Sequence, residues 1–273
     1  MANDSLRVAA VQVSSQDDLA SNLAACRAQI DAAAAQRPEL VLLPENFAYM
    51  GPDDGKQTVV ERLGDRNAPI QRMLADAAKA HGVTIVAGGF PEQSDDPRRP
   101  YNTCAVYDAH GELVASYRKI HLFDVELADG SSYRESAGSS AGSAPTVVTV
   151  GGFKVGLSIC YDLRFPELYR ALVDRGAEVL VVPAAFTVHT GKDHWHVLLR
   201  ARAIEAQCFV VAAGQWGKHP LGRTTYGHSL VVDPWGTVLA DAPDRTGFIV
   251  AELPRADLTR VRGSLPSLRH RRL

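Results

Sequence analysis

The sequence predicts a single α/β domain over residues 1–273, with a core at about 6–253 and a C-terminal tail at 254–273. Short apolar runs that fit buried strands alternate with longer stretches of helical periodicity, the pattern of a sheet covered by helices. Two of these runs, ELVLLPENF and EVLVVPAAF, resemble each other across the two halves of the chain. This similarity suggests two related half-sheets that pack face to face.

The composition is that of an ordinary globular protein. Hydrophobic residues make up 46% of the 273 residues and charged residues 22%, so a sizeable core is available. The formal net charge is -2 with both signs spread along the chain, and the basic run RHRR at 269–272 is too short to change that. We therefore expect neither a nucleic-acid nor a membrane partner.

The cysteines and the N-terminal residues indicate the compartment. Cys26, Cys104, Cys160 and Cys208 lie far apart and form no CxxC pair, which favours reduced, intracellular thiols. The first residues, MANDSLRVAAVQV, lack the apolar segment of a signal peptide, and no apolar run reaches the roughly 18 residues of a transmembrane helix. We expect a cytoplasmic protein.

The first half of the chain reads as alternating strands and helices. The expected elements are a strand at 6–13, a helix to about 36 capped by Asp17 or Ser21, a strand at 39–43, a helix at 67–80, a strand at 83–90, and a hairpin that turns at 108–111. Glu45 follows the third of these elements in the run PENF. Ligands bind at the carboxyl ends of strands in open α/β sheets, although a solvated loop glutamate is the alternative.

Two further charged residues follow in the chain. Lys119 ends the expected hairpin, where a lysine is usually solvated. Glu135 lies in the Ser- and Gly-rich segment 124–144, which we expect to be an irregular and mobile loop beside the active site. A surface position for both side chains is the alternative.

The stretch KVGLSICYDLRFPE at 154–167 brings Cys160 to the point where an expected strand turns into a helix. Pro166 fits the first turn of that helix, and Gly176 fits its end. A thiol at this point would face the positive end of the helix, which lowers a cysteine pKa and directs backbone N–H groups at an oxyanion. A buried core cysteine is the alternative.

The second half continues the alternation. The expected elements are a strand at 178–182, a loop and amphipathic helix at 189–205 with Val197, Leu198, Ala201 and Ile204 inward, a strand at 209–213, a hairpin at 226–239 that turns at 233–236, a strand at 248–253, and a polar, irregular tail.

Three sets of reactive side chains are possible. A Cys-His pair is disfavoured because no cysteine has a papain-type or caspase-type neighbourhood. A metal site at His189, His194 and His196 is disfavoured because their spacing is loose and no HExxH motif accompanies them, so we expect no metal.

The third set combines a carboxylate base, an ammonium group and a thiol. Glu45 would take the proton of Cys160, and the thiolate would attack an amide carbonyl. The Lys119 ammonium and the backbone N–H of Tyr161 would stabilise the oxyanion. A non-catalytic scaffold is disfavoured because all of these groups are present.

Three segments resemble the signatures of the carbon-nitrogen hydrolase (nitrilase) superfamily. They are PENF at 44–47, YRKIHLFD at 117–124 and ICYDLRFPE at 159–167. The resemblance implies that Glu45, Lys119 and Cys160 are catalytic and that Glu135 is the additional glutamate of the family. It also implies a four-layer αββα sandwich, pairing into a homodimer, and no organic cofactor.

The segments AFTVHTGKDHWHVLLRARAIEAQCFVVAA, RTTYGHSLVVDPWGTV and LPSLRHRR are most similar to the Nit branch. This implies a cysteine-dependent amidase that works through a thioester, on a small amide that carries an α-keto carboxylate. The implied reaction splits deaminated glutathione into 2-oxoglutarate and cysteinylglycine, as metabolite repair. Hydrolysis of 2-oxoglutaramate is the first alternative, and an N-carbamoyl amidase or a nitrilase uses the same three groups.

The branch also implies substrate-binding positions at Tyr161, Arg164, Phe186 and Thr190. A guanidinium group fits a carboxylate through two hydrogen bonds, although Arg164 pairing with Asp162 or Glu167 is the alternative. Two segments depart from the branch: GKDHWHVL has His196 where GPAHWEVL has a glutamate, and SAGSSAGS after Glu135 lacks the usual Pro-Gly. We expect both segments to affect the choice of substrate rather than the nucleophile.

Overall fold

The computed structural model describes residues 4–126 and 132–272. The helices are α1 (Leu19–Ala34), α2 (Asp53–Lys56), α3 (Pro69–His81), α4 (Glu135–Gly138), α5 (Pro166–Asp174), α6 (Val188–Ala206) and α7 (Arg255–Ser264), with 3₁₀ turns at Gln57–Val59, Cys160–Arg164, Pro220–Gly222 and Ser267–His270.

The strands form two large sheets and two short hairpins. The strands are β1 (Ser5–Gln12), β2 (Leu40–Leu43), β3 (Thr84–Glu92), β4 (Tyr101–Tyr107), β5 (Leu113–Arg118), β6 (Asp124–Glu126), β7 (Ser132–Arg134), β8 (Val147–Val150), β9 (Phe153–Leu157), β10 (Val179–Ala184), β11 (Phe209–Gly214), β12 (Trp216–Lys218), β13 (Thr224–Tyr226), β14 (Leu230–Val232), β15 (Val238–Asp241) and β16 (Gly247–Pro254).

The two large sheets have the same topology. The first has the order β16-β1-β2-β3-β4-β5, and the second, read from its other edge, has the order β8-β9-β10-β11-β14-β15. In both, three parallel strands are flanked by one antiparallel strand on one side and two on the other. The prediction of two related half-sheets is confirmed, since β2 and β10, which carry the two similar runs, occupy equivalent positions.

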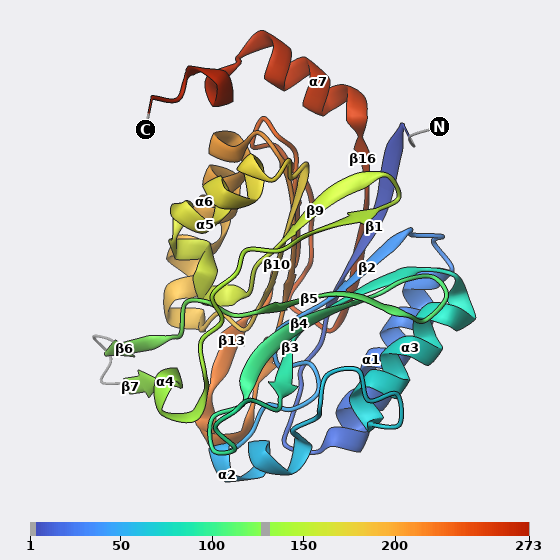
Figure 1. Ribbon diagram of the computed structural model, residues 1–273, viewed down its shortest axis with the longest axis vertical. Coiled ribbons are helices and arrows are strands. Elements are labelled where there is room, and N and C mark those ends of the chain that lie inside the picture. Colours follow the sequence, from blue (N-terminus) through green and yellow to red (C-terminus); the bar gives the residue numbers. More distant parts are fainter. Residues whose placement is uncertain (1–3, 127–131, 273) are drawn as a thin grey trace.

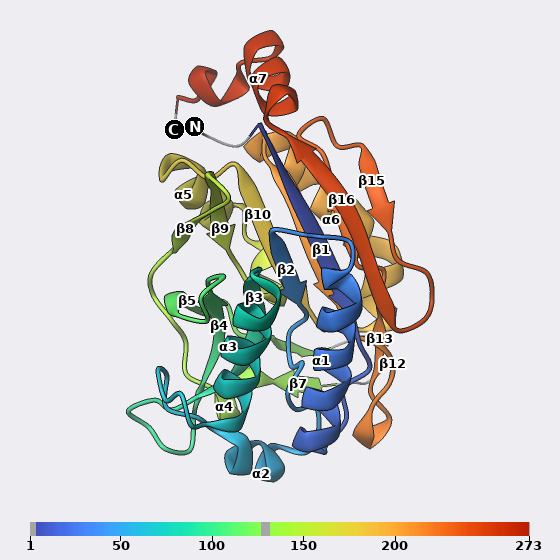
Figure 2. The same ribbon diagram turned by 90° about the vertical axis from the view of Figure 1, so that its right-hand side faces the viewer.

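The sheets pack face to face between two layers of helices (Figures 1 and 2). In β1, Leu6, Val8 and Ala10 belong to the core shared with the second sheet, whereas Ala9 and Val11 belong to the core shared with α1 and α3. Helices α5 and α6 cover the other sheet. This is the expected four-layer αββα arrangement, in which the central strands β2 and β3 of the first sheet are buried on both faces.

The expected inward face of α6 is wrong. Val197 is 66% exposed and Ile204 is 48% exposed, while Leu198 and Ala201 are half-buried. The buried stripe runs through Trp195, Leu199 and Ala203, each four residues apart. That stripe presents the large indole ring of Trp195 to the core, and the opposite face of the helix, with Val197 and Ile204, is turned toward solvent.

Three other expectations need correction. The cap of α1 is Asp18, whose carboxylate accepts from the Ser21 N–H at 2.8 Å, rather than Asp17 or Ser21. The tail is not irregular, because Leu258 and Val261 bury one face of α7. Segment 124–144 contains β6, β7 and α4, and its residues 127–131 lie outside the described residues.

Within residues 4–126 and 132–272, none of the helices combines the length and the apolar character needed to cross a membrane.

Candidate active site

A cavity of about 260 Å³ lies where the ends of strands from both sheets meet. Glu45 follows β2 and Lys119 follows β5 in one sheet, while Cys160 follows β9 in the other. All three side chains line the cavity, and Glu135 lines it from the start of α4. The four candidate catalytic residues, which are up to 115 positions apart in the chain, therefore share one site.

The charged groups form a buried hydrogen-bonded cluster. The Lys119 Nζ donates to Glu45 Oε1 at 2.9 Å and to Glu135 Oε2 at 2.8 Å. Glu45 Oε2 accepts from the backbone N–H of Ala185 at 3.1 Å, and Glu135 Oε2 accepts from the N–H of Phe123 at 2.7 Å. Each carboxylate is therefore fixed by the backbone as well as by the lysine.

Burial and charge act in opposite directions on this cluster. Burial alone would lower the pKa of Lys119, but the carboxylates of Glu135 and Glu45 outweigh it and hold that pKa well above its ordinary value. Burial would raise the pKa of Glu135, but the ammonium of Lys119 lowers it. The lysine therefore stays charged in a buried position, ready to face a developing negative charge.

The backbone at Cys160 has an unusual conformation. Its φ is +48°, in the left-handed region that residues with a Cβ seldom adopt, and it begins a 3₁₀ turn that precedes α5. The buried carboxylate of Asp162 holds this turn, because it accepts from the N–H of Ile159 at 2.8 Å and from the Tyr117 hydroxyl at 2.7 Å. The turn exposes the sulfur to the cavity although Cys160 is only 8% exposed.

The expected lowering of the thiol pKa is wrong. Burial first, and the negative charge of Glu45 second, raise the pKa of Cys160 well above its ordinary value, against the opposite effect of Lys119. The turn that begins at Cys160 is also a short 3₁₀ helix rather than the start of α5. The resting site thus holds a neutral thiol beside a carboxylate that can accept its proton.

Asn102 is a site residue that the sequence did not reveal. Its Nδ2 donates to Glu45 Oε1 at 2.9 Å and to Glu135 Oε1 at 3.2 Å, so it links the two carboxylates. A Cβ on Gly89 would lie 1.5 Å from the Asn102 Oδ1, which makes a glycine necessary there. The glycine pair in β3 was the available sequence signal for this close approach.

The expected substrate-binding residues also line the cavity. They are Tyr161, Arg164, Phe186 and Thr190. The Arg164 guanidinium lies 5.3 Å from the centroid of the Phe186 ring, and its Nη1 is 3.3 Å from the Nδ1 of His194. The carboxylate of Asp162 is instead bound to the turn around Cys160 and to His121.

Three more cationic residues among the described ones line the cavity, namely Lys56, Arg134 and Arg223, and the sequence did not reveal any of them. Lys56, from α2, donates to the Ser139 hydroxyl at 2.7 Å, and burial lowers its pKa while Glu135 raises it. Arg223 lies 5.5 Å from the Tyr133 ring centroid. No sequence spacing relates these positions to Cys160, so only the fold reveals them.

The three histidines considered as a metal site do not form one together. The ring of His194 faces Arg164, whereas the Nε2 of His196 is 2.9 Å from the Oδ2 of Asp241. His196, which replaces a glutamate expected near the cleft, is not among the residues that line the cavity.

The sequence matches the carbon-nitrogen hydrolase family over residues 7–263. A protein named deaminated glutathione amidase from Synechocystis is 47% identical over 266 residues, which cover 96% of this chain and 97% of that protein. The mouse protein of the same name is 40% identical over 97% of this chain and 83% of its own length. The crystal structure of the C. elegans NitFhit protein superposes with a TM-score of 0.92 and 38% identity, over the whole of this chain and 66% of that one.

Proposed function

The chain belongs to the carbon-nitrogen hydrolase family and is a hydrolase of carbon–nitrogen bonds other than peptide bonds. From this we propose that Cys160 is the nucleophile, Glu45 the general base and acid, Lys119 the oxyanion-stabilising cation and Glu135 a supporting carboxylate. The observation that supports these roles is that an acid, an ammonium and a sulfur from three distant segments line one cavity.

In the first step, Glu45 takes the proton of the Cys160 thiol, and the sulfur forms a bond to the amide carbonyl carbon. The carbonyl oxygen becomes an oxyanion, which the Lys119 ammonium and the backbone N–H of Tyr161 stabilise. Losing one such donor in a preorganised site costs about 3–4 kcal/mol. A neutral resting thiol suits this step, because proton removal coincides with attack.

In the second step, the carbon–nitrogen bond breaks and the amine leaves with the proton held by Glu45. Cys160 is left as a thioester. The same carboxylate then takes a proton from a water molecule, whose oxygen attacks the thioester carbonyl and releases the acid and the free thiol. The proton balance closes because Glu45 gains and loses one proton in each half-reaction.

We propose deaminated glutathione as the substrate, with 2-oxoglutarate and cysteinylglycine as the products. The names of the similar proteins from Synechocystis and mouse support this choice. The substrate has a carboxylate at each end and the scissile amide between them, and the cavity has cations to match. Arg164 would bind the α-keto carboxylate through paired hydrogen bonds.

Arg223 is our candidate for the second carboxylate, that of cysteinylglycine. The rings of Tyr161, Phe123 and Tyr133 form a row with centroids 5.0 and 5.2 Å apart. Arg164 lies near the Tyr161 end of this row and Arg223 near the Tyr133 end. Two guanidinium groups at opposite ends of an aromatic wall suit a long dianionic amide better than a short one.

The proposal extends to the setting of the enzyme. We propose that residues 1–273 act as one catalytic domain in the cytoplasm, as a homodimer. Val197, Ile204 and Trp235 are 66%, 48% and 56% exposed, and Ile204 lies beside Gly236. This apolar surface supports pairing with a second copy, which would remove it from water.

The test is a mass-spectrometric comparison of deaminated glutathione, 2-oxoglutaramate, an N-carbamoyl amino acid and a simple nitrile as substrates. We expect the highest kcat/KM with deaminated glutathione. Preference for any other compound would overturn the substrate, and activity on none of them would overturn the reaction. Sedimentation of the same preparation measures the oligomeric state.

A further inference from the structure

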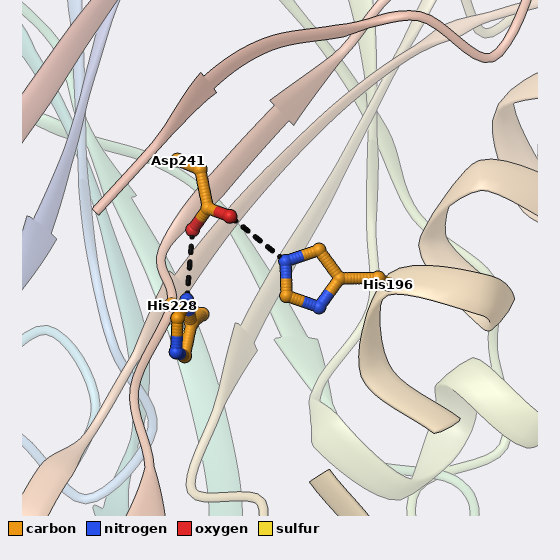
Figure 3. Close-up of side chains that lie close together, drawn as sticks. All are labelled: His196, His228 and Asp241. Carbon is orange, nitrogen blue, oxygen red and sulfur yellow. Dashed lines mark hydrogen bonds and ion pairs between the residues drawn. The ribbon is translucent and has the colours of Figure 1, made fainter. Parts of the chain in front are cut away.

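A cluster of side chains that could bind a metal ion lies outside the active-site cavity. It comprises His196 of α6, His228 just before β14 and Asp241 at the end of β15. One ligand atom from each lies within 4.8 Å of the others. The carboxylate of Asp241 stands between the two rings, with one oxygen toward each (Figure 3).

We propose that His196, His228 and Asp241 bind a Zn²⁺ ion. Two imidazole nitrogens and one carboxylate oxygen are a donor set that zinc accepts, with a water molecule in the fourth position of a tetrahedron. Bonds of about 2.0–2.1 Å to the metal place tetrahedral ligands roughly 3.3 Å apart. The Nε2 of His196 and the Nδ1 of His228 are 2.9 and 3.0 Å from the two oxygens of Asp241. The three ligand atoms lie within 4.8 Å of one another, so side-chain rotations that bring them to about 3.3 Å apart make room for the ion.

Contacts outside the three side chains also hold these residues in place. Trp195, beside His196 in α6, donates its indole N–H to the His228 carbonyl at 2.7 Å. Strand pairing places Leu230 opposite Asp241, and the Ala242 N–H donates to the Ser229 carbonyl at 2.9 Å. Ligands carried on rigid elements lose little entropy when they bind an ion.

The surroundings of His228 are those of a metal-ligating histidine. Its Nε2 is 3.3 Å from Asp244 Oδ1, so a carboxylate would orient the ring from behind while Nδ1 faces the ion. The ring also stacks on Tyr226, with centroids 4.4 Å apart.

The ligand atoms are reachable from solvent. The side chains of His196, His228 and Asp241 are 32%, 23% and 38% exposed. Their partial exposure leaves the fourth coordination position to water. The same three groups also satisfy one another as a hydrogen-bonded triad without a metal, so the measurement must distinguish the triad from the metal site.

The test uses full-length protein that carries Cys160→Ala, so that the active-site thiol cannot bind the ion. After treatment with a chelator, Zn²⁺ binding is measured by competition with a chromophoric chelator, and Co²⁺ serves as a visible-absorption probe of four-coordinate geometry. We expect one Zn²⁺ per chain and a tetrahedral Co²⁺ spectrum. Absence of saturable binding in this protein would overturn the proposal.

Three substitutions identify the ligands. They are His196→Gln, Asp241→Asn and His228→Asn, the last chosen because the φ of residue 228 is +52°, which asparagine tolerates. Each should weaken Zn²⁺ binding by more than the roughly 10- to 100-fold that follows loss of an outer partner of a ligand. The matched control is His110→Asn, at an exposed histidine in the β4–β5 turn. Equal binding by the ligand variants and the control would refute the site, whatever the amide-hydrolysis assay shows.

Discussion

The Lys119 ammonium and the Glu45 carboxylate are hydrogen-bonded at 2.9 Å, and their side chains are only 2% and 4% exposed. A buried ion pair of this kind costs desolvation, so breaking it leaves an uncompensated charge. Glu135 and Asn102 complete the hydrogen bonds of the pair. The arrangement holds the Lys119 amine and the Glu45 carboxyl group beside the thiol of Cys160, and each of the three groups can be tested separately.

Replacing Cys160 by alanine should abolish amide hydrolysis, by more than about 10⁴-fold in kcat, because no other group can form the acyl intermediate. Intact-mass measurement of quenched wild-type enzyme should detect the thioester adduct, and the variant should lack it. Cys26→Ala is the control, since that thiol lies on the buried face of α1 and outside the cavity. Turnover that survives in the Cys160 variant would contradict the mechanism.

The two neighbours of the thiol should shift its pKa in opposite directions. In Glu45→Gln the negative charge that raises the Cys160 pKa is lost, so the pKa should fall and iodoacetamide should react faster at neutral pH. In Lys119→Met the opposing cation is lost, so the pKa should rise and alkylation should slow.

Both variants should nevertheless lose turnover, Glu45→Gln by about 10²–10⁴-fold through loss of the base. The loss in Lys119→Met should be about 10²–10³-fold through loss of an oxyanion partner. The measurement is the alkylation rate against pH, read at Cys160 by peptide mass spectrometry. Equal alkylation rates in the two variants would show that these charges do not control the thiol.

Glu135→Gln should leave a working enzyme with an altered pH profile. Glu135 is the main group that raises the pKa of Lys119, so its neutralisation should lower that pKa and let the lysine lose its proton at lower pH. The alkaline limb of kcat against pH should therefore move to lower pH than in the wild type. If the alkaline limb is unchanged while kcat falls, Glu135 does not act through the pKa of Lys119.

Asn102→Leu should reduce kcat by up to about 10²-fold, because Glu45 and Glu135 lose the donor that holds them in position. Gly89→Ala should have a similar effect, since its Cβ would collide with the Asn102 side chain. Comparing the two variants is informative because Gly89 has no side chain of its own, so the effect of Gly89→Ala acts through the Asn102 side chain. Thermal unfolding of both variants distinguishes displacement of the site from general destabilisation.

Arg223→Met should discriminate between substrates. Loss of a charge-assisted hydrogen bond of about 1.5–3 kcal/mol would reduce kcat/KM for deaminated glutathione by roughly 10- to 150-fold. The shorter 2-oxoglutaramate has no second carboxylate, so its kcat/KM should be nearly unchanged. Arg164→Met is the matched variant, and it should impair both substrates. An equal effect of Arg223→Met on both substrates would show that Arg223 does not bind the second carboxylate.

The sequence predicted the central strands well because they are buried on both faces. Residues 40–43 and 179–182 are continuous apolar runs, each followed directly by a proline, and they correspond to β2 and β10. Helix α6 was harder, because Val197 and Ile204 are as apolar as the residues that face the core. Periodicity alone could not choose between two apolar stripes.

The motif residues of the site could be predicted because each follows a strand in a recognisable segment. The pKa of the Cys160 thiol could not be predicted in this way, since it depends on burial and on Glu45, a residue 115 positions away. Asn102 and Arg223 were missed for the same reason. Their importance arises from contacts across the fold rather than from their neighbours in the chain.

The proposed base and cation belong to one sheet, and the proposed nucleophile belongs to the other. Hydrogen bonds connect the two halves here. The Ala185 N–H donates to Glu45 Oε2 at 3.1 Å, and the Gln215 Nε2 donates to the Glu45 backbone carbonyl at 3.0 Å. If the two sheets slid past each other by a fraction of an ångström, the Cys160 sulfur would move away from the Glu45 carboxylate, although every strand would stay intact. Amide hydrolysis therefore depends on the relative position of the two sheets. On gentle warming, the enzyme should lose activity before circular dichroism detects any loss of secondary structure.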